Sequence, residues 1–345
     1  MVQYYGEHFA SRKEGVPRSM KRTMRRLASL VLVLALLVPA LAACGGAPSG
    51  PSPKPTPVTS SNPYDTSLYT QPKEGDGVYD VPSMRLAEFH ENLSEGTEDA
   101  RIDISAVRQG YVAVCATSDV RLKFQVRCEA ATYNYDISGD GTPAVFPLQS
   151  GNGSYTFRVM ENVSGTSYAE MYATTIDVTL EDEFAPFLVN NNYVRYAPDS
   201  YCIRTVQELS LGASSSVMVV ARVYDFICKN ITYDKQKAAT VGAGYVPDPD
   251  QTLADGRGIC FDYAALAAAM LRAMGIPTKM VFGNVEPNGL YHAWNMFYTE
   301  ETGWVTAGFS VREDEWNRID LTFSANGADR DFIGDGSNYT DLYYY

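Results

Sequence analysis

The stretch Gly-Ile-Cys-Phe-Asp-Tyr-Ala at residues 258–264 decides how the C-terminal half of the chain folds. It opens an apolar, alanine-rich segment that runs to Met274 and is followed by Gly275. Alanine favours helix and lets neighbouring elements pack closely, whereas glycine is a natural end for a helix. We therefore predict a central, buried helix over residues 260–274, with Cys260 at its start.

A cysteine at the start of a helix is chemically activated. The free N–H groups and the positive end of the helix dipole favour a thiolate there, and a nearby imidazolium favours it further. Apart from His8, near the N-terminus, the histidines of the chain are His90 and His292. His90 lies among polar residues and is predicted to be solvated, whereas His292 opens an alternating, strand-like segment. We predict that His292 is the base that pairs with Cys260.

A catalytic imidazole needs an acceptor that holds its tautomer. Asp320 begins a strand-like phrase, residues 318–323, and has an apolar residue on either side. Such a setting suits a buried carboxylate, so Asp320 is the predicted orienting group, with Asp314 and Asn295 as alternatives. This completes a predicted cysteine–histidine–aspartate triad.

The phrases around these residues resemble the transglutaminase-like superfamily, which has a papain-like core. The matching phrases are Gly258–Ala264, Leu271–Pro277, His292–Asn295, Gly303–Trp304 and Asp320–Thr322. The resemblance implies that Cys260 forms a thioester with an acyl donor, that His292 is the general base and acid, and that Asp320 orients His292. In many relatives the aspartate follows the Gly-Trp phrase closely, whereas here residues 305–317 intervene and are predicted to form an inserted hairpin.

The resemblance also implies an oxyanion hole, to which the backbone N–H of Cys260 would contribute. Either Tyr233 or Gln251 could supply the side-chain donor. The predicted function is a cell-surface cysteine enzyme that acts on peptide or isopeptide amides, as a hydrolase if water attacks the thioester. Two alternatives stay open: a transglutaminase that transfers the acyl group to an amine, and a non-catalytic binding module on the same fold. No metal or other cofactor is expected.

The N-terminal half has a different pattern. Residues 64–98 are weakly helical, around 84–93, and residues 99–183 alternate in hydrophobicity between turn-forming clusters. Short alternating strands at this spacing favour an immunoglobulin-like β-sandwich. The predicted fold class is therefore α+β, a β-sandwich followed by a papain-like, transglutaminase-like domain over residues 184–345.

The first 43 residues resemble a lipoprotein signal peptide. A basic cluster precedes a short apolar run, and Leu-Ala-Ala stands directly before Cys44. We predict that Cys44 is lipidated after cleavage and that residues 44–63, rich in proline and serine, form a tether. An ordinary signal peptide is the alternative. The resemblance, to exported lipoproteins of Gram-positive bacteria, implies an extracytoplasmic protein anchored by lipid at the cell membrane, with peptide or protein substrates that include cell-wall peptides.

Charge and cysteine content bound the partners and the redox state. The chain has 28 Lys and Arg against 41 Asp and Glu, a net charge of −13, which disfavours nucleic acid as a partner. Outside Cys44 and Cys260 the cysteines are even in number, and an exported location permits disulfides. The simplest pairing joins Cys115 to Cys128 and Cys202 to Cys228, and buried free thiols are the alternative.

Overall fold

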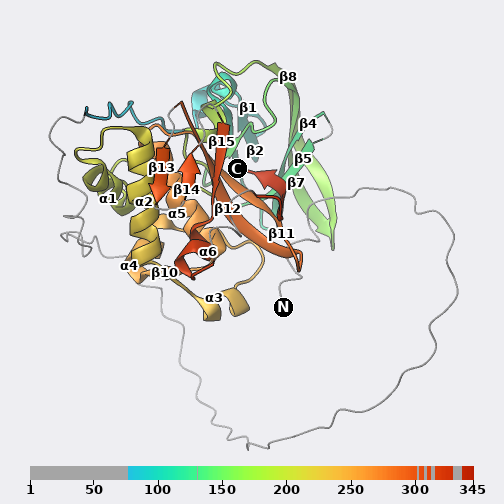
Figure 1. Cartoon of the computed structure of the whole chain (residues 1–345). Coiled ribbons are helices and arrows are strands. Elements are labelled where there is room, and N and C mark those ends of the chain that lie inside the picture. Colours follow the sequence, from blue (N-terminus) through green and yellow to red (C-terminus); the bar gives the residue numbers. More distant parts are fainter. Residues whose placement is uncertain (1–76, 130, 301–302, 307–308, 312–314, 329–335) are drawn as a thin grey trace, which may run out of the picture. The chain divides into compact units, whose positions relative to one another are not determined.

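The computed structural model describes residues 77–129, 131–300, 303–306, 309–311, 315–328 and 336–345. The predicted signal peptide, the lipidation site Cys44 and the tether lie outside the described residues. Among the described residues, no helix is long and apolar enough to span a membrane. The fold is mixed α and β, with a β-rich N-terminal region before a helix-and-sheet domain, as the sequence predicts (Figure 1).

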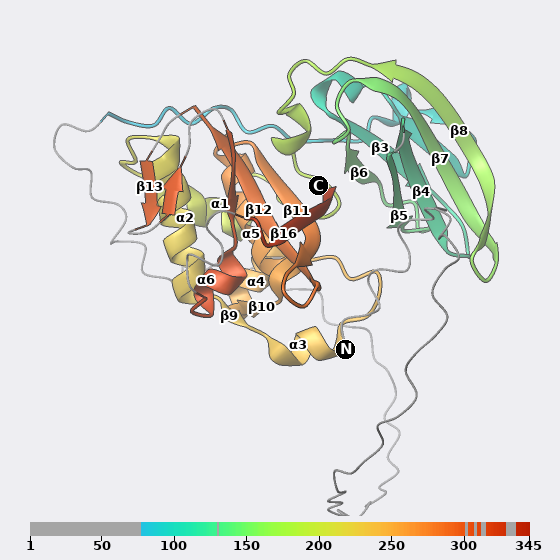
Figure 2. The same cartoon turned by 45° about the vertical axis from the view of Figure 1, so that its right-hand side comes forward.

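The N-terminal region is a β-sandwich of two antiparallel four-stranded sheets, ordered β1-β2-β3-β6 and β5-β4-β7-β8 (Figures 1 and 2). The first sheet comprises β1 (Glu95–Gly96), β2 (Ala100–Asp103), β3 (Tyr111–Ala116) and β6 (Ala144–Pro147). The second comprises β4 (Leu122–Cys128), β5 (Ala131–Ile137), β7 (Gly153–Ser164) and β8 (Ser167–Val178). This order matches an immunoglobulin-like sandwich whose C and C′ strands are β4 and β5.

The alternation read from the sequence explains how the two sheets pack. Inward residues of β4 are buried and alternate with more exposed ones along most of the strand. Phe124 of β4 meets Phe146 of β6 across the sandwich, with ring centroids 5.2 Å apart. Tyr135 of β5 meets the same Phe146 at 4.2 Å. Apolar side chains of both sheets thus share one core, which stabilises the sandwich.

The predicted disulfide pairing is wrong, because the five cysteines within the described residues are free thiols. Cys115 lies on β3 and Cys128 on β4, and these strands belong to different sheets rather than pairing with each other. Cys202, on helix α1, is fully buried, whereas the thiol of Cys228 faces the main-chain oxygen of Leu321 at 3.8 Å. The alternative expectation, buried free thiols, holds for Cys128 and Cys202, whereas Cys115 and Cys228 are free but half-buried.

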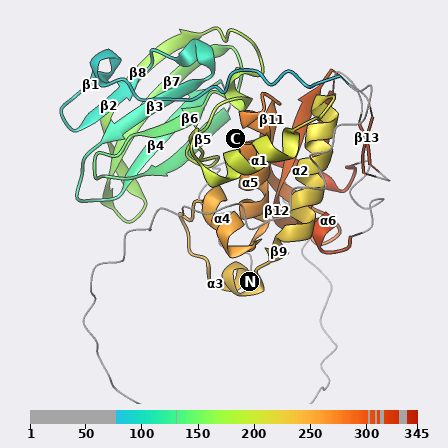
Figure 3. The ribbon, with the colours of Figure 1, turned by 90° about the vertical axis from the view of Figure 1, so that its left-hand side faces the viewer.

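The C-terminal domain is built around helix α5 (Cys260–Ala273). Helices α1 (Tyr201–Ser210), α2 (Ser216–Asn230) and α4 (Pro249–Asp255) pack against it (Figure 3). The predicted helix is confirmed: every residue after Cys260 is buried, and Gly275 adopts the left-handed φ of +74° just beyond the C-cap Met274. Six alanines in α5 allow this close approach from several sides.

An antiparallel sheet of four strands, ordered β15-β12-β11-β16, also packs on α5 (Figure 2). Its members are β11 (Thr278–Val285), β12 (Leu290–Thr299), β15 (Glu315–Ile319) and β16 (Tyr339–Tyr344). The predicted inserted hairpin, residues 305–317, is only partly what forms: β14 (Phe309–Val311) pairs antiparallel with β13 (Gly303–Thr306), which begins at the Gly-Trp phrase. Residues 315–317 belong instead to β15 of the main sheet. A helix set against a strand thus brings the start of α5 and the start of β12 into one region.

Several local predictions differ from the structure. The lead-in has no α-helix among its described residues, only the short 3-10 turn η2 (Glu91–Leu93). Further 3-10 turns are η3 (Val107–Gln109) and η4 (Ala185–Phe187). The strand expected at 318–323 ends at Ile319 and gives way to helix α6 (Leu321–Ala325), because the Asp320 carboxylate accepts the N–H of Phe323 and caps that helix.

The segment before α5 contains two short helices that the sequence analysis did not predict. Helix α3 (Lys235–Thr240) is capped by Asp234, and α4 is capped by Asp248 with a proline at its first position. Between α2 and α5 the chain also forms the parallel pair β9 (Thr232–Tyr233) and β10 (Arg257–Gly258). Tyr233 is thereby paired with Gly258, two residues before the predicted nucleophile.

Candidate active site

Cys260 is the first residue of α5 and is held there by a neighbouring carboxylate. Asp262, fully buried, accepts the main-chain N–H of Ile259 at 2.7 Å, which caps the helix start. Asp262 also accepts the hydroxyl of Tyr245 and pairs with Lys237 Nζ at 2.7 Å. The helix start that carries Cys260 is therefore held in place, and the free N–H groups and positive end of the helix dipole lie at this residue.

The local sequence explains this geometry. A Cβ atom on Gly258 would lie 2.6 Å from the Cβ of Asp262, so only glycine fits beside the capping carboxylate. The capping role of Asp262 was not among the sequence predictions. An acidic residue at the third helical position is a recognised capping signal, and it could have been found from the sequence.

His292 lies at the start of β12, opposite Gly283 of β11, and is 4% exposed. Its Nε2 atom is 2.8 Å from Asp320 Oδ2. The Cys260 thiol lies close enough to this ring to act on the His292 pKa. Since Nε2 is hydrogen-bonded to Asp320, Nδ1 is the ring nitrogen that remains available to interact with the thiol. The ring stacks on Phe323, with centroids 4.4 Å apart, which fixes its plane.

The charge state of His292 follows from these contacts. Burial by itself lowers the pKa of His292, but the charge and hydrogen bond of Asp320, joined by Cys260, raise that pKa to about 10. An imidazolium is thus favoured at neutral pH. A cation beside Cys260 stabilises a thiolate, which is the form of cysteine that attacks a carbonyl carbon.

Asp320 is buried, at 1% exposure, between β15 and α6. Its Oδ1 atom accepts the N–H of Phe323 at 3.0 Å, and its Oδ2 atom faces His292. The alternatives are not placed at the imidazole by any described contact. The Asn295 amide donates to Ala264 O at 2.9 Å, and Asp314 lies outside the described residues. The structure therefore brings Cys260, His292 and Asp320 together.

The two candidate oxyanion donors differ in position. Tyr233 pairs with Gly258, two residues before Cys260. Burial, followed by the charges of Cys260 and Asp262, raises the pKa of Tyr233 to about 12, so its hydroxyl stays protonated. Gln251 is exposed, and its amide donates to Asp255 at 2.8 Å on the surface of α4. Tyr233 is the candidate that the structure places near Cys260.

The other cysteines within the described residues are expected to be weak nucleophiles. Burial raises the pKa of Cys115 and Cys128, raises that of Cys228 to about 12, and raises that of Cys202 well above its usual value. A thiol with a raised pKa contains little thiolate at neutral pH. Cys260 is therefore the thiol most suited to react within the described residues.

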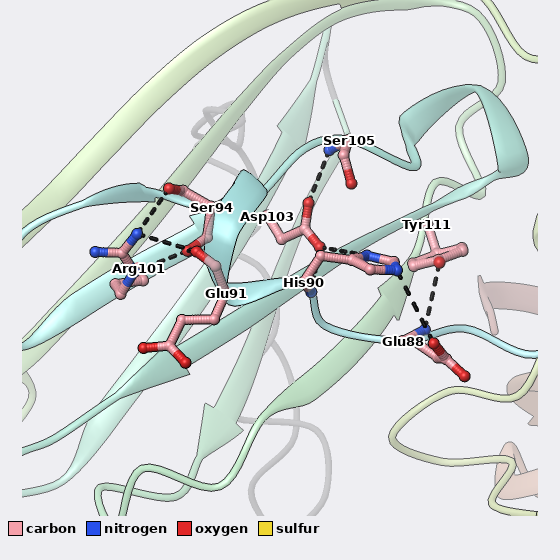
Figure 4. Close-up of polar contacts among 8 residues, drawn as sticks. All are labelled: Glu88, His90, Glu91, Ser94, Arg101, Asp103, Ser105 and Tyr111. Carbon is pink, nitrogen blue, oxygen red and sulfur yellow. Dashed lines mark hydrogen bonds and ion pairs between the residues drawn. The ribbon is translucent and has the colours of Figure 1, made fainter.

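The His90 side chain is 38% exposed and so partly solvated, as predicted, but it also pairs with a buried carboxylate (Figure 4). Its Nδ1 atom lies 3.0 Å from Asp103 Oδ2, and its main-chain N–H donates to the same oxygen at 2.7 Å. The ring lines a surface pocket beside Glu88 and Tyr111. The reason is tertiary: β2 carries Asp103 underneath the lead-in segment, a neighbour that the local sequence around His90 does not reveal.

Comparisons with known proteins place part of the chain in a known family. Residues 203–308 match the family described as the transglutaminase-like superfamily. Similar solved structures include a proposed cysteine protease from Cytophaga hutchinsonii (15% identity, 67% of this chain and 73% of that chain, TM-score 0.33). Others are LapG from Legionella pneumophila (15%, 42% and 70%, 0.26) and the transglutaminase of red sea bream (13%, 61% and 48%, 0.26). No curated protein matches the chain.

Proposed function

Residues 203–308 of this chain form a transglutaminase-like domain, and we propose that it is a cysteine enzyme that cleaves peptide or isopeptide amides through a thioester. The observation that carries the proposal is the convergence of three groups. Cys260 stands at a helix N-terminus, within reach of an imidazole that is itself held by Asp320 at 2.8 Å. This is the arrangement that covalent catalysis by a thiol requires.

The first half of the proposed reaction forms the acyl-enzyme. The Cys260 thiolate attacks the carbonyl carbon of the amide, and the carbonyl electron pair moves onto oxygen. The N–H of Cys260 and the hydroxyl of Tyr233 stabilise this oxyanion. When the C–N bond breaks, the His292 imidazolium gives its proton to the leaving amine. The products are a free amine and a thioester on Cys260.

The second half releases the acyl group. Neutral His292 removes a proton from water as the water oxygen attacks the thioester, and the C–S bond breaks to restore the thiolate. Asp320 keeps the ring in the tautomer that makes this exchange possible. The products are a carboxylic acid and the original thiolate–imidazolium pair, so the cycle is balanced in atoms and charge.

Hydrolysis is the proposed outcome because water needs no second binding site. Transfer to an amine is the second candidate, and the net charge of −13 favours it by attracting cationic amines such as lysine side chains. Isotope labelling and amine labelling, each with a pool of peptides as substrate, distinguish hydrolysis from transfer to an amine. Hydrolysis in ¹⁸O-water places the label in new carboxylates, whereas transfer incorporates a fluorescent primary amine and releases ammonia from glutamine.

The proposed place of action is outside the cytoplasm. Lipidation of Cys44 would anchor the chain to the membrane, and residues 44–63 would hold the folded part away from it. Peptides, surface proteins and cell-wall peptides would then be the accessible substrates. Mass spectrometry of the membrane-bound form tests the anchor directly, because it would show an acylated N-terminal Cys44.

The experiment that tests the enzyme proposal is the pH dependence of Cys260 alkylation by iodoacetamide, with peptide masses used to follow each cysteine separately. In the full chain held in detergent, we expect Cys260 to be alkylated faster at neutral pH than the other cysteines. His292→Ala should remove that reactivity. A Cys260 that reacts only as an ordinary thiol in both forms would contradict the proposal and favour a non-catalytic binding module.

A further inference from the structure

We propose that Tyr339 is a positioning residue for this reaction, an inference that rests on the proposed function. The Tyr339 hydroxyl donates to Asp320 Oδ2 at 3.0 Å, the same oxygen that lies 2.8 Å from His292 Nε2. The other oxygen, Oδ1, accepts the N–H of Phe323 at 3.0 Å. The carboxylate is thus held at three points, and β16 supplies one of them.

Tyr339 is itself held rigidly. It is 8% exposed and pairs with Val285 at one end of the β11–β16 ladder. Its ring meets Trp294 edge-on, with centroids 4.9 Å apart and planes at 74°. The Arg318 guanidinium lies 4.8 Å from the ring centroid on another side, and that cation is tied to Asp341 at 2.9 Å. A hydroxyl on such a ring has little freedom to leave its acceptor.

The hydroxyl of Tyr339 acts as a donor, not as a proton carrier. Burial raises its pKa well above the ordinary tyrosine value, and the charge and hydrogen bond of Asp320 raise it further. The proton therefore stays on the phenol at every pH at which the enzyme would work. Tyr339 does not exchange protons with the triad, but it fixes the direction in which Asp320 presents its charge to His292.

The role follows from what Asp320 would do without this donor. A buried carboxylate oxygen that loses one of two donors regains freedom to rotate, and its bond to the imidazole becomes less well aligned. The imidazolium is then held less firmly, and the Cys260 thiolate that it stabilises becomes less populated. The effect reaches the thiol only through Asp320 and His292.

The test compares Tyr339→Phe with Tyr344→Phe in the full chain held in detergent. Tyr344 is a matched control, because it lies on the same strand and its hydroxyl donates to another carboxylate, Asp341 Oδ2, at 3.1 Å. We expect Tyr339→Phe to lower the rate of Cys260 alkylation by iodoacetamide about tenfold at about pH 6. The pH midpoint of alkylation should also rise, whereas Tyr344→Phe should leave both unchanged.

Two outcomes would overturn the inference while the proposed function stands. One is a Tyr339→Phe variant whose alkylation profile equals that of the unsubstituted chain, although His292→Ala still abolishes reactivity. The other is a loss caused by unfolding, which the fully buried Cys202 would report by becoming reactive as well. A distinct failure, ordinary thiol behaviour of Cys260 in the unsubstituted chain, would overturn the proposed function and this inference together.

Discussion

The two regions of the molecule each contain a histidine–aspartate pair, and the pairs differ in their surroundings. Asp103 in the sandwich and Asp320 in the C-terminal domain are both 1% exposed. His292 is almost as buried as its partner, at 4%, whereas the His90 side chain is 38% exposed. His292 uses Nε2 toward its aspartate, and His90 uses Nδ1. The pair alone does not define a catalytic site.

The second ring nitrogen separates the two pairs. Under the proposed function, the second nitrogen of His292 exchanges a proton with the Cys260 thiol, which lies close to the ring. For His90 it lies 3.9 Å from the Glu88 carboxylate, which supplies no nucleophile to activate. Asp103 also accepts the main-chain N–H of His90 at 2.7 Å. Under the proposed function the first pair acts in catalysis, whereas the second fastens the lead-in segment to the sandwich.

The largest expected effect comes from neutralising each aspartate in turn. Asp320→Asn should lower the rate of the p-nitrophenol burst from p-nitrophenyl acetate on the order of 10³-fold. The reason is that the imidazole loses both its charged partner and the acceptor that fixes its tautomer. Asp103→Asn should leave the burst within about twofold, because that site lacks a nucleophile. Stopped-flow absorbance measures both, and an equal loss in the two variants would erase the distinction.

The two pairs should affect the free energy of unfolding at opposite ends of the pH range, His292 at alkaline pH and Asp103 at acid pH. The folded-state pKa of His292 is raised from 6.5 to about 10, so its contribution is complete below 6.5 and is lost as pH rises toward 10. Burial tends to raise the pKa of Asp103, but hydrogen bonds from Ser105 and His90 lower it below 3.8. The Asp103 contribution is therefore present above 3.8 and is lost as pH falls further.

Urea unfolding followed by circular dichroism across the pH range checks this prediction. Asp320→Asn should flatten the alkaline part of the stability curve, and Asp103→Asn should flatten the acid part. All three tryptophans, Trp294, Trp304 and Trp316, belong to the C-terminal domain, so their fluorescence reports that domain separately. If Asp103→Asn flattened the alkaline part of the stability curve and Asp320→Asn the acid part, these assignments of the two pairs would be contradicted.

The smallest expected effect is that of His90→Gln. The substitution removes the 3.0 Å side-chain bond to Asp103 but keeps the main-chain N–H that donates to the same carboxylate. We expect a loss of about 0.5–1 kcal/mol in the free energy of unfolding, measured by urea titration. Cys260 alkylation should not change. A change in that rate would mean that the sandwich pair acts on the active site after all.

Much of the candidate site could be predicted from local sequence because its signals are local. Gly258 before a cysteine, alanines after it and Gly275 beyond them mark the start and end of one buried helix. The scarcity of histidine left His292 as the natural partner. The caps Asp234 and Asp248 were equally visible in the sequence, and the short helices that they begin could have been predicted.

The sequence by itself therefore determined the kind of each principal element and the chemical groups at the start of α5 and β12. Only the tertiary structure decided which distant groups meet. It set Cys115 and Cys128 in different sheets, placed Asp103 beneath His90, and carried Tyr339 to Asp320. The physical reason is that periodicity and capping act over a few residues, whereas strand order and sheet pairing are settled by burial across the whole fold.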